Sequence, residues 1–192
     1  MNHVRRLAVV ALLGCLCFVS AGATVAQAPA VPPEPSERDG QHDFDFHLGN
    51  WNSRIRMLQR PLTGSTTWID LSGTLVVREV WGGRAQLEEL VVDGSGRHIE
   101  DLLLFLYNPQ TRQWSLNPAA SGDGAMGPRL IGEFSNGRGE FHSIEPALRG
   151  RSVFVRQIWS DITPTSHRFE QAFSNDGGRT WETNFVATLT RQ

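Results

Sequence analysis

From residue 42 onward, short runs of alternating or apolar residues are separated at regular intervals by turn-forming residues. Residues 51–57 show the pattern clearly, because Trp51, Ser53, Ile55 and Met57 fall on one face of an extended chain. The pattern is typical of antiparallel strands connected in chain order. It predicts strands over residues 51–57, 66–81, 85–93, 98–107, 112–117, 128–134, 139–144, 151–161, 166–174 and 180–191.

The expected fold class is therefore all-β: an antiparallel meander of about ten strands. A meander of this length leaves fewer unpaired edges when it closes, so a closed barrel is favoured over a sandwich. One short helical turn is expected at residues 43–48, ended by Gly49. The chain of 192 residues has room for one such domain.

The first 28 residues have the layout of a secretory signal peptide. Arg5 and Arg6 precede an apolar stretch over residues 7–20, and small residues around Ala28 suit a cleavage site. Cleavage after Ala23 is an alternative. A second alternative is lipidation of Cys15, because Leu12-Leu13-Gly14-Cys15 resembles a bacterial lipobox. The expected location is the periplasm or the exterior of a bacterial cell.

The domain boundaries follow from this interpretation. Residues 1–28 are the leader, residues 29–41 form a Pro-rich linker, and residues 42–192 form the barrel. Cleavage after Ala28 removes both cysteines of the chain, Cys15 and Cys17. The exported domain then has no disulfide and no thiol chemistry, and its core alone must stabilise it.

Charge and motifs exclude several classes of function. The net charge is −2, whereas a nucleic-acid or anionic-membrane partner would require a basic excess. No histidine spacing indicates a metal site, and no phosphate-binding loop or nucleophile elbow is present. No metal and no cofactor is therefore predicted, and no membrane contact is expected once the leader has been removed.

Two short motifs indicate structural roles. Gly49-Asn50-Trp51 follows the expected helical turn and resembles the start of the lipocalin and calycin barrels. That resemblance implies that Trp51 closes one end of the barrel and that Arg191 stacks across it. Residues 174–181 fit the Asp-box pattern Ser-x-Asp-x-Gly-x-Thr-Trp, in which Asp176 holds a turn and Trp181 packs beneath it.

The chain as a whole resembles the DUF1579-like family of bacterial calycin-type proteins. The residues that carry this resemblance are found in segments 44–51, 107–114, 158–164, 170–174 and 181–184. The family brings no established activity. Within the same superfamily, nitrobindins bind haem, so His142 or His167 could in principle hold a haem iron; a single strand histidine is more often structural.

Polar residues in the late strands are the candidates for ligand binding, since burying them is costly unless they are paired or meet a ligand. The candidate set is Arg156, Trp159, Gln171, Glu182 and Asn184. The favoured function is the binding of a small, partly apolar molecule inside the barrel. The alternatives are a hydrolase or isomerase that uses Arg156 with Glu170 or Glu182, and an interaction module whose barrel is filled.

Overall fold

The structure is a computed structural model that describes residues 39–146 and 152–192. Of the two units into which the chain divides, Met1–Ser36 lies outside the described residues and Glu37–Gln192 contains the barrel. The predicted leader and most of the predicted linker therefore fall outside the described residues. None of the helices in the described ranges has the length and apolar character needed to span a membrane.

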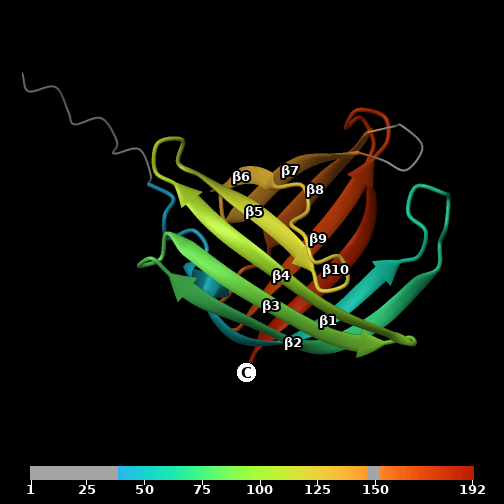
Figure 1. The fold of residues 1–192 in the computed structure, drawn as a ribbon, viewed down its shortest axis with the longest axis horizontal. Coiled ribbons are helices and arrows are strands. Elements are labelled where there is room, and N and C mark those ends of the chain that lie inside the picture. The colour runs from blue at the N-terminus through green and yellow to red at the C-terminus, as the bar shows by residue number, and fades with distance from the viewer. Residues whose placement is uncertain (1–38, 147–151) are drawn as a thin grey trace, which may run out of the picture. The chain divides into compact units, whose positions relative to one another are not determined.

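Within the described ranges, ten antiparallel strands and one short 3-10 helix, η1 (Asp45–His47), form a closed barrel (Figure 1). The strands are β1 (Gly49–Leu58), β2 (Trp68–Val80), β3 (Ala85–Gly94), β4 (Arg97–Asn108), β5 (Gln113–Ala120), β6 (Leu130–Ser135), β7 (Arg138–Pro146), β8 (Ser152–Ser160), β9 (Ser166–Ser174) and β10 (Glu182–Arg191). Each strand pairs with its neighbour in sequence, and β10 closes the barrel by pairing with β1. The all-β meander barrel expected from the sequence is confirmed.

The main difference from the sequence prediction lies in β5, which continues through Pro118 to Ala120 where a loop was expected. Beyond Leu116, β5 pairs with β4 and not with β6. Proline interrupts a sheet because it lacks an N–H donor, and this loss is tolerated here because the edge of β5 away from β4 has left β6 and forms an isolated bridge between Ala119 and Met126. The carbonyl oxygen of Pro118 instead accepts a bond from the amide of Gly127 at 2.8 Å.

Strand β2 comes very close to β3 at Gly73. A Cβ atom at Gly73 would lie 2.0 Å from the carbonyl oxygen of Val91, which no side chain could tolerate. Glycine at position 73 therefore permits a close approach between neighbouring strands.

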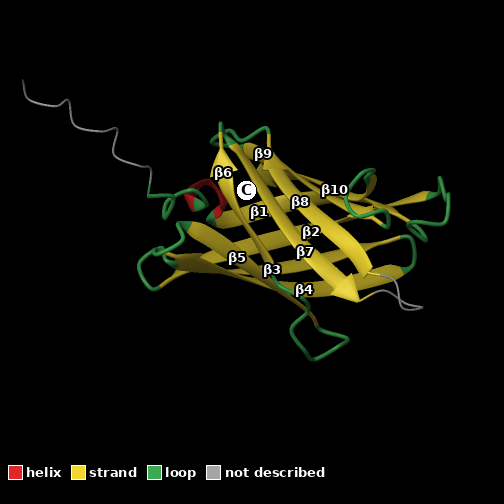
Figure 2. Cartoon of the chain, turned by 90° about the horizontal axis from the view of Figure 1, so that it is seen from above, coloured by secondary structure: helices red, strands yellow, loops and turns green. Residues whose placement is uncertain are grey.

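The two ends of the barrel differ. Helix η1 lies at one end, whereas the loops between β1 and β2 and between β9 and β10 extend at the other (Figures 1 and 2). The end at η1 is filled by an aromatic cluster around Phe44, which packs edge-on against Phe105, Trp114, Phe134 and Trp159. This end is therefore closed, and the loops define the other end as the mouth.

Candidate ligand-binding cavity

The barrel interior between the aromatic cluster and the mouth contains a cavity of about 390 Å³. Most of its wall is apolar. The apolar side chains that line it include Ile55, Met57, Leu75, Leu90, Ile99, Leu103, Trp159, Phe169, Phe185, Ala187 and Leu189. On β1 and β10 the lining residues alternate with outward ones, whereas β4 and β5 also contribute consecutive residues, at 101–103 and 118–120. The volume lies within the range of small-molecule sites.

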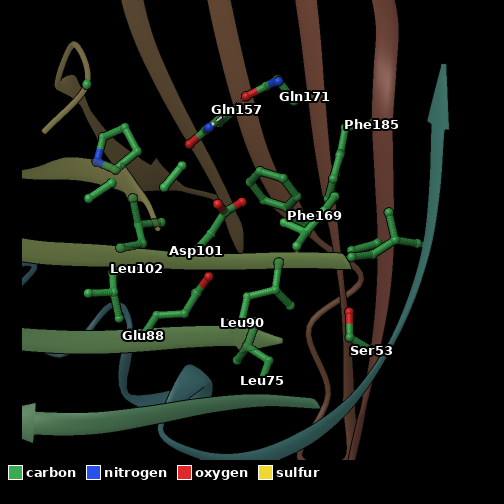
Figure 3. A pocket seen from close by; sticks show the side chains of 18 of the residues that line it. Ser53, Leu75, Glu88, Leu90, Asp101, Leu102, Gln157, Phe169, Gln171 and Phe185 are labelled. Atoms are coloured by element: carbon green, nitrogen blue, oxygen red, sulfur yellow. Dashed lines mark hydrogen bonds between the residues drawn. The ribbon is translucent and has the colours of Figure 1, made fainter. Parts of the chain in front are cut away.

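Three carboxyl groups interrupt this apolar wall, and that of Asp123 comes from the loop between β5 and β6. Glu88 on β3 and Asp101 on β4 come from neighbouring strands, and both line the cavity. Figure 3 shows the two carboxyl groups reaching into the same space, with the ring of Phe169 nearby. Burial raises the pKa of Asp101, and the negative charges of Glu88 and Asp123 raise it further. Asp101 forms no ion pair with any described residue.

A chain of three side-chain amides lies on another part of the wall. Gln157 donates to Gln171 at 2.9 Å, and Gln171 donates to Asn184 at 3.3 Å. Gln157 is only 8% exposed, and its Oε1 atom has no hydrogen-bond partner among the described residues. The Oγ atom of Ser53, also on the cavity wall, is likewise unpaired within the described structure. Buried polar atoms of this kind are satisfied by a ligand or by water.

The inner end of the cavity is formed by His47 of η1. Its Nε2 atom lies 2.6 Å from Oε2 of Glu88, and its Nδ1 atom lies 3.0 Å from Nε2 of His167 on β9. The side chain of Glu88 is 12% exposed, and His167 is 1% exposed. Burial, together with repulsion from His47 and Arg191, lowers the pKa of His167 to about 3. Glu88 is thus connected through His47 to a neutral imidazole behind the cavity.

The closed end has the arrangement that the calycin resemblance implied. The guanidinium of Arg191 lies 4.1 Å from the ring centroid of Trp51, and it donates to the carbonyl oxygens of Leu48, Phe46 and Pro164. Gly49 has a φ of +113°, and a Cβ atom there would lie 2.8 Å from a guanidinium nitrogen of Arg191. Glycine at this position makes room for the arginine.

The Asp-box turn lies at the mouth. Asp176 accepts bonds from the amides of Arg179 and Thr180, both at 3.0 Å, and from the Ser174 and Thr180 hydroxyls at 2.7 Å. These bonds, those from Thr180 above all, lower the pKa of Asp176. The ring of Trp181 lies under the guanidinium of Arg156 at 4.5 Å. Asp176 and Trp181 thus occupy a turn and the outer wall, away from the cavity.

The structure separates the five predicted ligand-binding residues. Trp159 and Gln171 line the cavity, and Asn184 reaches it only through its bond to Gln171. Arg156 lies on the outer face against Trp181. Glu182, the first residue of β10, accepts a bond from the amide of Leu62 and so ties β10 to the loop between β1 and β2. These placements leave the ligand-binding role of the set a prediction.

The arginine and glutamate residues of the enzyme alternative also lie apart from the cavity. Glu170 accepts a bond from Arg168 at 2.9 Å, and neither residue lines the cavity. Arg156 and Glu182 lie outside it as well. The cavity therefore contains none of the interior pairs that this alternative required.

The sequence analysis missed His47, Glu88 and Asp101. Strand alternation could have found the two carboxyl groups, because Glu88 shares a face with the buried Leu90 and Val92, whereas His47 lies in η1, where alternation gives no signal. Asp101 likewise shares a face with the buried Leu103 and Phe105 of β4. A carboxyl residue at one of the alternate strand positions that otherwise carry buried apolar residues points into the barrel.

Neither histidine considered for haem is free inside the cavity. His142 is half-exposed on the outer face, where it contacts Glu140 at 3.0 Å and lies near Trp181. His167 is packed between His47, Phe46 and Trp51. In the described part of the chain, no group of three or more His, Cys, Asp or Glu residues is placed to hold a metal ion.

The fold is a closed antiparallel barrel, and solved structures of other proteins are similar to it. Among solved structures, the crystal structure of Rv2717c from M. tuberculosis is similar, with a TM-score of 0.57 and 14% identity over 81% of this chain and 98% of that chain. The S-type phycobiliprotein lyase CpeS from Guillardia theta has a TM-score of 0.55 and 11% identity over 81% of this chain and 94% of its own. No family model and no curated protein matches the sequence. At these identities the likeness concerns the fold alone.

Proposed function

We propose that this protein is an exported binding protein that holds a small, partly apolar molecule inside its barrel. The cavity is the observation that carries this proposal. Its volume of about 390 Å³ lies in the range of ligand sites, and its wall is apolar with a few polar groups. The unpaired oxygen atoms of Ser53 and Gln157 within the described structure support a ligand that supplies their partners.

Membership of the DUF1579-like family and export to the periplasm or exterior are part of the same proposal. The sequence motifs over residues 44–51 and 158–184 support the family, and the leader pattern supports export. Expression of the complete sequence in a bacterial host, followed by N-terminal sequencing, would test export. Cleavage after Ala28 or Ala23 is expected; a lipidated Cys15 would indicate a membrane-anchored form, and an intact Met1 would contradict export.

Native mass spectrometry tests ligand binding. The protein, expressed from its complete sequence and recovered from the host envelope, is expected to carry an additional mass that is lost on denaturation. The matched variants are Ala187→Phe, which fills the cavity, and Thr188→Phe, whose side chain lies on the outer face. Only Ala187→Phe should lose the additional mass while both variants keep the circular dichroism of a folded barrel.

The opposite result is equally clear. A bare polypeptide mass, combined with unchanged tryptophan fluorescence across a library of small apolar molecules, would overturn the proposal, because Trp159 lines the cavity and should report an occupant. Equal retention of the mass by Ala187→Phe and Thr188→Phe would place the ligand outside the cavity.

A further inference from the structure

We propose that the ligand of the cavity is an amphipathic cation, an apolar body with a protonated amine that Glu88 and Asp101 bind. This inference rests on the proposed binding function and narrows it to one chemical class. Its basis is that the cavity wall carries acidic groups and unpaired oxygen atoms for which the described protein residues supply too few positive charges and hydrogen-bond donors.

The first step concerns charge. Glu88, Asp101 and Asp123 all line the cavity, whereas no Arg is present among the described residues that line it. His47 is the only other titratable residue on the described wall, and both of its ring nitrogens are engaged, one by Glu88 and the other by His167. The wall is therefore acidic, and a cation is the guest that such a site attracts.

The second step concerns hydrogen bonds. The Oε1 atom of Gln157 belongs to a side chain that is more than nine-tenths buried, lines the cavity, and finds no donor among the described residues. The hydroxyl oxygen of Ser53, which also lines the cavity, likewise has no hydrogen-bond partner among the described residues. An alkylammonium group offers three donors and no acceptor, so any of the carboxyl, amide and hydroxyl oxygens on this wall can accept from it. A carboxylate guest would instead add acceptors to a wall that already has an excess.

The third step concerns the rest of the ligand. Phe169, Leu90 and Leu75 lie around the two carboxyl groups, and Phe185 lies farther along the wall (Figure 3). An apolar body buried there gains free energy from the removal of its surface from water. The ring of Phe169 near the carboxyl groups also offers a face to a cation. The polar and apolar parts of the wall thus match the two parts of an amphipathic amine.

The test uses octylamine, octanol and octanoate, which share one chain and differ only in the head group. Isothermal titration of the full chain at neutral pH should give the tightest binding for octylamine, with octanol at least about tenfold weaker, since a charge-assisted hydrogen bond contributes about 1.5–3 kcal/mol. Octanoate should bind most weakly. Replacing Asp101 with Asn should remove most of the preference of octylamine over octanol.

The control and a second variant keep the test independent of folding. Asp93→Asn removes a carboxyl group of β3 that is 71% exposed on the outer face, and it should leave the preference unchanged. If Asp101→Asn fails to fold, Glu88→Gln replaces it, because the glutamine amide keeps the shape of the side chain and a hydrogen bond to His47.

The outcomes separate the inference from the function on which it rests. Equal affinities for octylamine and octanol, or tightest binding of octanoate, would overturn the cationic ligand while leaving a ligand-binding barrel. The cationic ligand would also be overturned if the protein bound none of the three compounds but retained a natural ligand that is neutral or negatively charged. Binding of none of the three by a protein with a bare native mass would count against both.

Discussion

The buried rings of His47 and His167 lie 3.0 Å apart, Nδ1 to Nε2, so one imidazole donates to the other. The carboxylate of Glu88 can only accept, so Nε2–H of His47 donates to it, and one hydrogen lies between Nδ1 of His47 and Nε2 of His167. The other ring nitrogen of His167, Nδ1, has no hydrogen-bond partner among the described residues. Three of the four ring nitrogens of His47 and His167 are therefore hydrogen-bonded, and Nδ1 of His167 is left without a partner in the described structure.

This arrangement predicts a decline in stability with acid. The folded pKa of His167 is about 3, below the ordinary value of 6.5, so the unfolded chain binds the extra proton first as the pH falls. The stabilising contribution is complete above about pH 6.5, and it is lost as the pH falls from there toward 3. The free energy of unfolding, measured with urea, should fall with a slope of up to about 1.4 kcal/mol per pH unit from this group.

The variant His167→Gln keeps a donor toward His47 and removes the titration. Its unfolding free energy should depend less on pH between 3 and 6.5 than that of the wild type, whatever its stability at neutral pH. His142→Gln, which changes a half-exposed histidine on the outer face, is the control and should keep the wild-type slope. Parallel pH profiles for wild type and His167→Gln would contradict the assignment of this proton.

A second prediction concerns the closed end. Arg191 combines stacking on Trp51 with hydrogen bonds to three carbonyl oxygens, and a lysine cannot reproduce this planar fork. We expect Arg191→Lys to lower the free energy of unfolding by about 1–3 kcal/mol, since the cation–π contact and the lost bonds each contribute about 0.5–1.5 kcal/mol. Arg138→Lys, on an exposed side chain, should change it little. Equal effects of the two variants in chemical denaturation would show that Arg191 does not hold this end together.

A third prediction concerns the Asp-box turn. Asp176→Asn replaces a carboxylate oxygen by an amide that cannot accept all the bonds from Ser174, Arg179 and Thr180. Because those bonds lower the pKa of Asp176, its contribution is complete above the ordinary carboxyl value of 3.8 and is lost in stronger acid. Wild type should melt at a higher temperature than the variant at neutral pH, and the difference should shrink in acid. A constant difference across pH would assign the effect to packing instead.

Much of the fold could be predicted because alternation and turn residues are local signals. Strand β9 was predicted with its observed bounds, and the pairing of Trp51 with Arg191 follows once β1 and β10 are known to be neighbours. The extension of β5 through Pro118 could not be predicted from the sequence. It depends on where the pairing between β5 and β6 stops, which is at Leu116 of β5, and this pairing is a tertiary contact.

The candidate site was predicted less well, for two physical reasons. Arg156 lies between the inward residues Val155 and Gln157, so strict alternation already places it outside. Glu182 and Asn184 lie where β10 shifts its register between Thr183 and Phe185. A bulge of this kind interrupts the alternation, so the direction of neighbouring side chains cannot be read from the sequence.

The fourth prediction is that Asp101 lowers the stability of the empty barrel and raises its affinity for a cationic ligand. Burial and nearby negative charge raise the folded pKa of this carboxyl group above its unfolded value, so the folded chain binds the proton more tightly than the unfolded chain does. The stabilising contribution of the protonated form is complete below the unfolded pKa and is lost as the pH rises through the folded pKa. Ionisation of Asp101 therefore costs stability in the empty barrel as the pH rises, and Asp101→Asn, which cannot ionise, should raise the melting temperature of the empty protein at neutral pH.

Octylamine should reverse that order. A ligand that binds only the folded state raises the melting temperature by mass action, and the ammonium group offsets the cost of the buried carboxylate. Differential scanning fluorimetry should therefore show a large upward shift with octylamine for wild type and a small one for Asp101→Asn. A lower melting temperature for the empty variant would instead mean that Asp101 stabilises the barrel wall, and that its carboxyl group is present for the fold and not for a ligand.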